Sequence, residues 1–355
     1  MSRTYKATGI NLKNMPLGES DRLVTILTRE EGLIRATAPG ARKPRSKLSG
    51  RSQLFVVNEL LLYRGRSLAK ITQAQTIKSY PGLSRDLGKL AAGQYIAELV
   101  LCQALSEQPQ EELFDLTCEH LSRIERSPAV PQASSRVPVM PLLTQGIYHL
   151  LAFAGVAPQV HNCCLTGLTL TPDFKNPNWK VGFSFSAGGA VSLSRSLSSG
   201  DRPGQARSLT NANQSNGSQS NGNQGNAFRI DPSRSNRPKP RLNSGQLNSG
   251  QLNSRQLDAR QLNSGQLNSG QLDSRQLNAR LSAAELAILQ QLSYAELPPL
   301  ERLFSDPSAR MPSSRALDRI WISLERLLRG YTEYQFERQI RSATPLDSYT
   351  QETIT

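Results

Sequence analysis

Five short segments in the first 80 residues carry the alternating apolar pattern of β-strands, and they constrain the fold more than any other feature. The candidate strands are Tyr5–Lys13, Arg22–Thr28, Leu33–Ala38, Leu54–Tyr63 and Leu68–Ser79. Hairpin turns are expected at residues 29–32 and 64–66, where Gly32 and Gly65 would supply a positive φ. Five strands in so short a stretch predict an OB-fold, a barrel that commonly binds oligonucleotides, with an SH3-like barrel as the structural alternative.

Helical spacing replaces this alternation after Leu83. Apolar residues recur at three- and four-residue intervals over 87–102, 113–124 and 143–151, with a Pro-rich linker at 128–141. Helical signals return at Leu281, where Ser282 and Glu285 form a capping box, and a longer helix is expected from about Ser314. The fold class is therefore α+β: a five-stranded OB-fold barrel followed by an all-helical domain. Residues 158–191 are rich in turn residues and predict a small irregular or β-hairpin subdomain.

Residues 194–280 differ in kind, because Asn, Ser, Gln, Gly and Arg dominate and a pentapeptide such as Gly-Gln-Leu-Asn-Ser repeats. Leucines five residues apart advance about 140° around an α-helix, so they form no apolar stripe, and in a strand they alternate between faces. A pentapeptide β-helix is an alternative, but the position two residues before each leucine alternates Gly with Arg. One leucine in five buries too little area to offset chain entropy, so we expect a long disordered insert.

These changes in pattern divide the chain into five regions. We expect an OB-fold domain at 1–80, the first part of a helical domain at 81–157, the irregular subdomain at 158–193, the low-complexity insert at 194–280 and the C-terminal part of the helical domain at 281–345. The two helical parts should pack together, since the helix from Ser314 carries a broad apolar face.

Positive charge is concentrated in the predicted barrel. Residues 1–80 hold fifteen Lys/Arg against five Asp/Glu, and no acid occurs from Gly32 to Asn58. Ordinary surfaces intersperse the two signs, so a basic β-module with a cationic loop at 40–47 favours binding to a phosphate backbone. A solvated surface that only aids solubility is the simpler alternative. The candidate nucleic-acid-binding residues are Arg35, Arg42, Lys43, Arg45, Lys47, Arg51, Arg64, Arg66 and Lys70. Candidates for stacking on bases are Tyr5, Phe55 and Tyr63, of which Phe55 better suits the core.

A search for catalytic residues finds no recognisable constellation. The histidines stand at 120, 149 and 161, and the first two fall within helical patterns, which favours core or boundary positions. No phosphate-binding Gly-Lys-Ser/Thr loop, nucleophile elbow or metalloprotease His pair occurs in the sequence. We therefore expect no enzymatic activity, no cofactor and no small-molecule substrate. An enzyme of unrecognised type is a further alternative, which a pocket with convergent titratable groups would support.

The cysteines, at 102, 118, 163 and 164, suggest no disulfide framework and fit a reducing cytoplasm. His161 and Cys164, with Cys163 beside it, supply only half of a tetrahedral zinc site, so no metal is expected. No targeting segment is visible at the start of the chain, and the most apolar window, Val139–Val156, is interrupted by polar residues as in a buried helix. We therefore expect no membrane association.

Several segments together resemble the RecO family of bacterial recombination mediators. The similarity is closest in Gly18–Thr25, Thr28–Gly32, Pro39–Ser46, Arg64–Leu68 and Thr72–Ala74. Tyr95–Leu99, Phe183–Gly189 and Glu337–Ser342 are similar to later landmarks of the family. The resemblance covers essentially the whole chain except 194–280.

The resemblance implies an N-terminal OB-fold, a helical domain and, in some members, a four-cysteine zinc module. Here Cys164-x-x-Gly167 stands where a Cys-x-x-Cys pair is expected, and Ala190-Val191 follow the glycine pair in place of cysteines, so the module is degraded. Members of the family bind single- and double-stranded DNA and anneal complementary strands. With RecR they help to load RecA onto strands coated by single-stranded DNA-binding protein, whose acidic tail they recognise.

The resemblance therefore implies a DNA-repair mediator with a cytoplasmic, nucleoid-associated location. Its partners would be DNA, RecR, single-stranded DNA-binding protein and, indirectly, RecA. An RNA- or ribosome-associated OB-fold protein is the alternative function, since basic barrels serve both roles.

Overall fold

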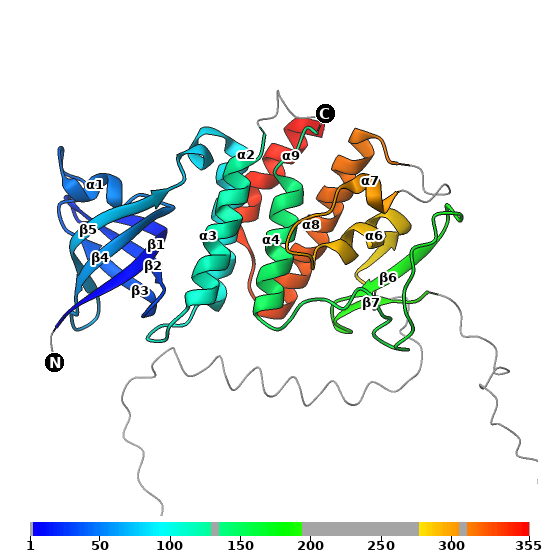
Figure 1. The fold of residues 1–355 in the computed structure, drawn as a ribbon, viewed down its shortest axis with the longest axis horizontal. Helices are drawn as coiled ribbons and strands as arrows, with labels where there is room; N and C mark the ends of the chain where they lie inside the picture. Colours follow the sequence, from blue (N-terminus) through cyan, green and yellow to red (C-terminus); the bar gives the residue numbers. More distant parts are fainter. Residues whose placement is uncertain (1–2, 129–134, 194–276, 305–310, 355) are drawn as a thin grey trace, which may run out of the picture. The chain divides into compact units, whose positions relative to one another are not determined.

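Five strands at the start of the chain form a closed barrel (Figure 1) in the computed structural model, which describes residues 3–128, 135–193, 277–304 and 311–354. The strands are β1 (Thr4–Leu17), β2 (Asp21–Thr28), β3 (Gly32–Ala38), β4 (Val56–Tyr63) and β5 (Ala69–Ser79), in the order β1-β2-β3-β5-β4. Neighbouring strands pair antiparallel except β3 and β5, which pair in parallel at Ala36–Ala69 and Thr37–Lys70. The predicted OB-fold barrel is confirmed.

The long strand β1 makes closure possible because it pairs with two neighbours in turn. Its first half, Thr4–Ile10, pairs with β4, and its second half, from Gly9 to Leu17, pairs with β2. A register shift between Asn11 and Lys13 marks the bend between these halves. The barrel interior is filled by apolar side chains from all five strands, among them Ala7, Val24, Ile26, Ala36, Leu60, Leu62 and Ile71.

The two predicted hairpin turns differ in backbone geometry. Gly32 has φ +67°, as expected for the turn between β2 and β3. The positive φ predicted for Gly65 is wrong, because Gly65 is not among the described residues with that conformation. A Cβ atom at Gly65 would instead overlap the Leu68 carbonyl, so only glycine lets the backbone at residue 65 come this close to Leu68.

Helices dominate the remainder of the described chain. They are α2 (Leu87–Gln103), α3 (Glu111–Arg126), α4 (Met140–Phe153), α6 (Ala283–Gln291), α7 (Leu300–Leu303), α8 (Ser314–Phe336) and α9 (Thr344–Ile354), with 3-10 turns η1 (Pro81–Arg85) and η5 (Arg341–Ala343). Their shared core includes Tyr95, Leu113, Leu143, Ile147, Leu324 and Leu328, so the segments on either side of residues 194–276 pack together.

The predicted capping box of Ser282 and Glu285 begins α6. Within the described residues, no helix combines the length and the apolar character needed to cross a membrane.

A three-stranded sheet follows α4 and takes its last strand from beyond the insert. β6 (Lys180–Ser184) lies between β7 (Gly189–Val191) and β8 (Ala279–Ser282), and both pairings are antiparallel. The hairpin of β6 and β7 agrees with the predicted β-hairpin subdomain, whereas β8 and the final helix α9 were not predicted. Most of the predicted disordered insert, residues 194–276, lies outside the described residues.

The chain leaves and re-enters this sheet at neighbouring points. Leu193 and Leu277, the last and first described residues around the insert, both approach Gly182 of β6, where a Cβ atom would lie 3.0 Å from Leu193 and 2.8 Å from Leu277. The glycine therefore makes room for both leucines.

The connection between α2 and α3 packs against the barrel at the start of β3. Ser106 forms a β-bridge with Gly32, and the Leu33 N–H donates to the Leu105 carbonyl at 2.8 Å. At the start of α3, Glu111 and Asp115 both form ion pairs with Arg29. We call residues 104–110 the α2–α3 strap. It occupies the edge at the start of β3, where β5 makes no pairing.

Candidate nucleic-acid interface

The densest cationic stretch of the sequence folds as a compact turn and a short helix rather than as an open loop. Gly40 and Arg45 both adopt a left-handed conformation, with φ values of 62° and 64°. Ser46 then caps α1 (Lys47–Arg51), its side chain accepting a hydrogen bond from the Leu48 N–H at 3.3 Å. The helix was not predicted. We call residues 39–52 the loop–α1 segment.

The start of this segment is fixed to the turn between β1 and β2. The Asp21 carboxylate accepts the Gly40 N–H at 2.8 Å, and the Arg42 N–H donates to the Ser20 carbonyl at 2.8 Å. The Arg42 guanidinium also donates to the Gly18 carbonyl at 2.8 Å. Two of the sequence segments that carry the family resemblance, Gly18–Thr25 and Pro39–Ser46, are therefore hydrogen-bonded to each other.

The end of the loop–α1 segment is fixed by three asparagines of the barrel. The Asn11 amide donates to the carbonyls of Arg51 and Gln53, both at 2.8 Å. The Asn58 amide also donates to the Arg51 carbonyl, at 2.9 Å, and Asn14 donates to Ser52 at 3.0 Å. Asn11 and Asn58 are buried, so these hydrogen bonds explain why polar side chains stand inside apolar strands.

Arg22 completes the support of α1. Its guanidinium donates to the Ser49 carbonyl and to the Ser52 hydroxyl, both at 3.0 Å. Leu48 turns the other way and packs against the barrel core, and Figure 1 shows α1 lying across one end of the strands. The sequence reasoning did not identify Arg22, Asn11, Asn14 or Asn58 as positioning residues. The available signal was the presence of asparagine at inward positions of predicted strands.

Most of the predicted cations lie exposed on the barrel, and four of the exposed ones, Arg42, Lys43, Arg45 and Lys47, belong to the loop–α1 segment. The exposed ones are Arg35, Arg42, Lys43, Arg45, Lys47, Arg64, Arg66 and Lys70, and Arg51 is half-buried. Within the described residues, only Arg64 of this set forms an ion pair. The others therefore present charge that no acid of the described chain neutralises by direct contact.

The structure brings cations from the loop and from β5 to one place. The hydrogen bond from the Gly40 N–H, and then that from Ser20, hold the pKa of Asp21 below its usual value, and the charges of Lys43 and Lys70 lower it further. Both lysines therefore lie within electrostatic reach of the same carboxylate. Arg35 points outward from β3, the strand whose Thr37 is paired with Lys70.

Arg64 belongs to a different corner of the barrel. Its guanidinium forms an ion pair with Glu31 at 2.9 Å and lies over the Tyr5 ring, 5.2 Å from the ring centre. Its charge is therefore partly neutralised by Glu31. Of the three candidates for stacking on bases, Tyr5 is covered by the Arg64 guanidinium. Phe55 is buried in the core, as expected, and Tyr63 is exposed at the end of β4.

The region similar to a zinc module keeps a tight turn around Cys163. The Gly167 N–H donates to the Cys163 carbonyl at 2.8 Å, and the Cys163 thiol accepts the Ser192 N–H at 3.3 Å. Burial acts to raise the pKa of Cys163, but hydrogen bonds, chiefly with Thr166 and Ser192, together hold it below its usual value. No group of three or more His, Cys, Asp or Glu side chains that could hold a metal ion occurs in the described chain.

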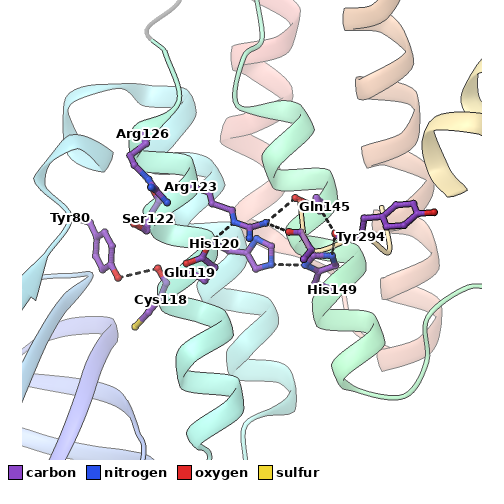
Figure 2. Close-up of polar contacts among 11 residues, drawn as sticks. Tyr80, Cys118, Glu119, His120, Ser122, Arg123, Arg126, Gln145, His149 and Tyr294 are labelled. Atoms are coloured by element: carbon purple, nitrogen blue, oxygen red, sulfur yellow. Dashed lines mark hydrogen bonds and ion pairs between the residues drawn. The ribbon is translucent and has the colours of Figure 1, made fainter. Parts of the chain in front are cut away.

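His120 of α3 and His149 of α4 form a hydrogen-bonded pair between the helices, as Figure 2 shows. The His120 Nε2 and His149 Nδ1 atoms are 3.1 Å apart, and the His149 Nε2 atom lies 3.1 Å from the Tyr294 carbonyl. Because a carbonyl only accepts, His149 must carry its proton on Nε2, and His120 Nε2 must then donate to His149. Burial, and to a smaller degree His149 and Arg123, lowers the pKa of His120 to about 3. Both imidazole rings are therefore neutral, and their hydrogen bonds connect α3, α4 and the Tyr294 carbonyl.

An OB-fold barrel bearing an unneutralised cationic segment, followed in the same chain by a helical domain, defines a class of protein suited to bind nucleic acid. Models of two domain families match this chain: Recombination protein O N terminal over residues 1–80 and Recombination protein O C terminal over residues 84–200.

Similar proteins extend over nearly all of the chain. The DNA repair protein RecO of Nostoc punctiforme is 46% identical over 354 residues, covering 98% of this chain and 97% of the relative. That of Gloeothece citriformis is 44% identical over 348 residues, covering 98% of each chain. The RecO protein of Trichodesmium erythraeum is 61% identical over 193 residues, 54% of this chain and 67% of the relative. The chain belongs to the RecO family of DNA repair proteins. Nothing in these similarities supports the RNA- or ribosome-associated alternative.

Proposed function

We propose that this protein is a recombination mediator that binds single- and double-stranded DNA and anneals complementary strands through the loop–α1 segment. The observation that carries the proposal is the set of exposed cations, Arg42, Lys43, Arg45 and Lys47, held on a hydrogen-bonded support without ion pairs in the described chain. Arg35, Arg51 and Lys70 extend the same surface. Arg66 is exposed as well, and Arg64 contributes less because it is already paired with Glu31.

Annealing by such a surface requires no covalent chemistry. Two DNA strands repel each other through their phosphates, and cations that contact both strands screen this repulsion at short range. A fixed cationic segment loses little conformational freedom on binding, because its backbone is already held by Asp21, Asn11 and Asn58. The protein therefore lowers the barrier to pairing by bringing strands together.

The family membership supports a wider role for the chain. We propose that residues 1–80 form the DNA-binding domain and that the helical domain contacts other repair proteins. In this proposal the protein acts with RecR to load RecA onto strands coated by single-stranded DNA-binding protein, and it recognises the acidic tail of that protein. Capture of the full chain by a tail peptide, compared with a peptide whose acids are changed to amides, tests the last contact.

Strand annealing across a salt series tests the DNA-binding surface. The fourfold variant Arg42→Ala, Lys43→Ala, Arg45→Ala, Lys47→Ala should anneal more slowly, and the log–log salt slope of its single-strand binding should be shallower by roughly 3, about 0.7 per lost phosphate contact. A matched control removes four exposed cations elsewhere, Arg85, Arg126, Lys175 and Lys180. Equal loss in both variants would mean that net charge alone drives annealing. Unchanged annealing in the first variant would place the DNA face elsewhere.

A further inference from the structure

A cleft of about 550 Å³ opens next to the C-terminal end of α1. Gly50 and Gln53 line it from the loop–α1 segment and the turn that follows. Thr76 and Ser79 line it from the end of β5, and Ser84 lines it from η1. The cleft is therefore contiguous with the surface that carries the proposed phosphate contacts.

The lining of the cleft is uncharged and of two kinds. Leu54, Val56 and Leu90 supply apolar surface, and none of the lining residues is Asp, Glu, Lys or Arg. Gln53 and Ser79 are exposed polar residues whose side chains have no hydrogen-bond partner within the described chain. The cleft thus offers an apolar wall together with free donors and acceptors, and no charge to attract a phosphate or an ionic ligand.

Cations stand directly beside this uncharged cleft. Lys47 lies three residues before Gly50, so both belong to one side of α1, and Arg51 follows Gly50 in sequence. A single strand of DNA has the same division of chemistry, with phosphates along its backbone and flat, uncharged bases to one side. We infer that the cleft receives unpaired bases of a single strand whose phosphates contact the loop–α1 segment.

This inference rests on the proposed function and adds a preference to it. Bases in a duplex are stacked and paired, so they cannot enter a cleft without being extruded. The cleft therefore strengthens single-strand binding and leaves duplex binding to the cations. The Gln53 amide both donates and accepts, which suits the edges of all four bases and gives little sequence preference.

Gly50 allows the cleft to be filled without altering any cation. Its φ is not in the left-handed region, and a Cβ atom there would meet nothing within 4 Å. Gly50→Leu should weaken single-strand binding roughly tenfold, in line with the exclusion of one base from the cleft. The salt slope should stay unchanged because no phosphate contact is lost, and duplex affinity should stay within about twofold. Gln75→Leu, which adds the same side chain at an exposed position of β5 outside the cleft, should bind as the parent does.

A second measurement reports on the bases directly. An oligonucleotide carrying 2-aminopurine should change its fluorescence at saturation with the full chain, and Gly50→Leu should reduce that change. Single-strand affinity and fluorescence that are the same in Gly50→Leu and the parent would overturn the inference. The failure of the parent chain to bind any DNA would overturn the proposed function itself. A shallower salt slope in Gly50→Leu would also count against the inference, because the substitution would then act on phosphate contacts.

Discussion

At the scale of single residues, buried asparagines decide how the cationic segment is presented. Asn11 is 1% exposed, and its amide satisfies two carbonyls at the end of α1. A buried carbonyl without a donor costs free energy, and a freed α1 would carry Arg51 and Lys47 out of position. Polar side chains of β1 and β4 therefore support the loop–α1 segment from within the barrel.

Asn11→Ala should lower the free energy of unfolding by roughly 2 kcal/mol, since it removes two hydrogen bonds made by a buried amide to the part-buried carbonyls of Arg51 and Gln53. Asn14→Ala removes one hydrogen bond from a half-buried position and should cost about 1 kcal/mol or less. Urea unfolding of both variants measures the difference. Equal and small losses would show that Asn11 does not hold the end of α1.

The buried histidine pair gives the protein a pH-dependent stability. The folded pKa of His120 is about 3, against an ordinary value of 6.5, so the unfolded chain binds more protons between these pH values. Stability is complete above about pH 6.5 and decreases as the pH falls toward 3, with a loss of roughly 2 kcal/mol between pH 7 and pH 5. His120→Gln should flatten this decrease in urea unfolding at several pH values. His161→Gln, at an exposed position, is the control and should keep the parent's slope.

At the scale of elements, the turn between β2 and β3 depends on the α2–α3 strap. Gly32 combines φ +67° with the close approach of the Leu105 and Gln108 carbonyls, which a Cβ atom would overlap. Gly18 has a similar φ, +59°, but open space around it. A comparison of these two glycines therefore separates the cost of a left-handed backbone from the cost of steric overlap with the strap.

Gly32→Ala should destabilise the protein by at least about 3 kcal/mol, because strain and displacement of the strap add together. Gly18→Ala should cost only the strain, about 1–2 kcal/mol. Thermal unfolding of the two variants provides the comparison. If both lost the same amount, the strap would not be a fixed part of the fold.

Elements with strong local patterns were predictable from the sequence, and those defined by distant contacts were not. The five barrel strands, the capping box at Ser282 and the long helix α8 follow from alternation, capping chemistry and helical spacing. β8 is four residues long and exists because β6 offers an edge. The strap is likewise bound through distant contacts with the turn between β2 and β3.

The candidate site likewise combines features that local sequence reveals with features that depend on distant contacts. The cations could be read directly from their density and from the absence of acids between Gly32 and Asn58. Their support could not, because Arg22 and Asn11 reach carbonyls 27 to 42 residues away in sequence. The pairing of Arg64 with Glu31 also required the barrel to close.

At the scale of the whole molecule, the described chain breaks off at Leu193 and resumes at Leu277 beside the same residue, Gly182. β7 and β8 flank β6, so their adjacent ends are about 10 Å apart, two strand spacings. Replacing residues 194–276 by eight Gly/Ser residues should raise the thermal unfolding midpoint by roughly 4 °C, since a loop about tenfold shorter removes about three doublings of loop length, each costing only about 0.6 kcal/mol. A much lower midpoint would show that the insert contributes to the folded core.

The α2–α3 strap also has a consequence for behaviour in a crowded solution. On the side away from β2, the start of β3 has no strand partner because β5 pairs only with Ala36 and Thr37, and an open strand edge is a template for cross-molecular pairing. Leu105 and Ser106 occupy that edge with their own backbone. The strap thus covers the edge through which the barrels of two copies could otherwise pair.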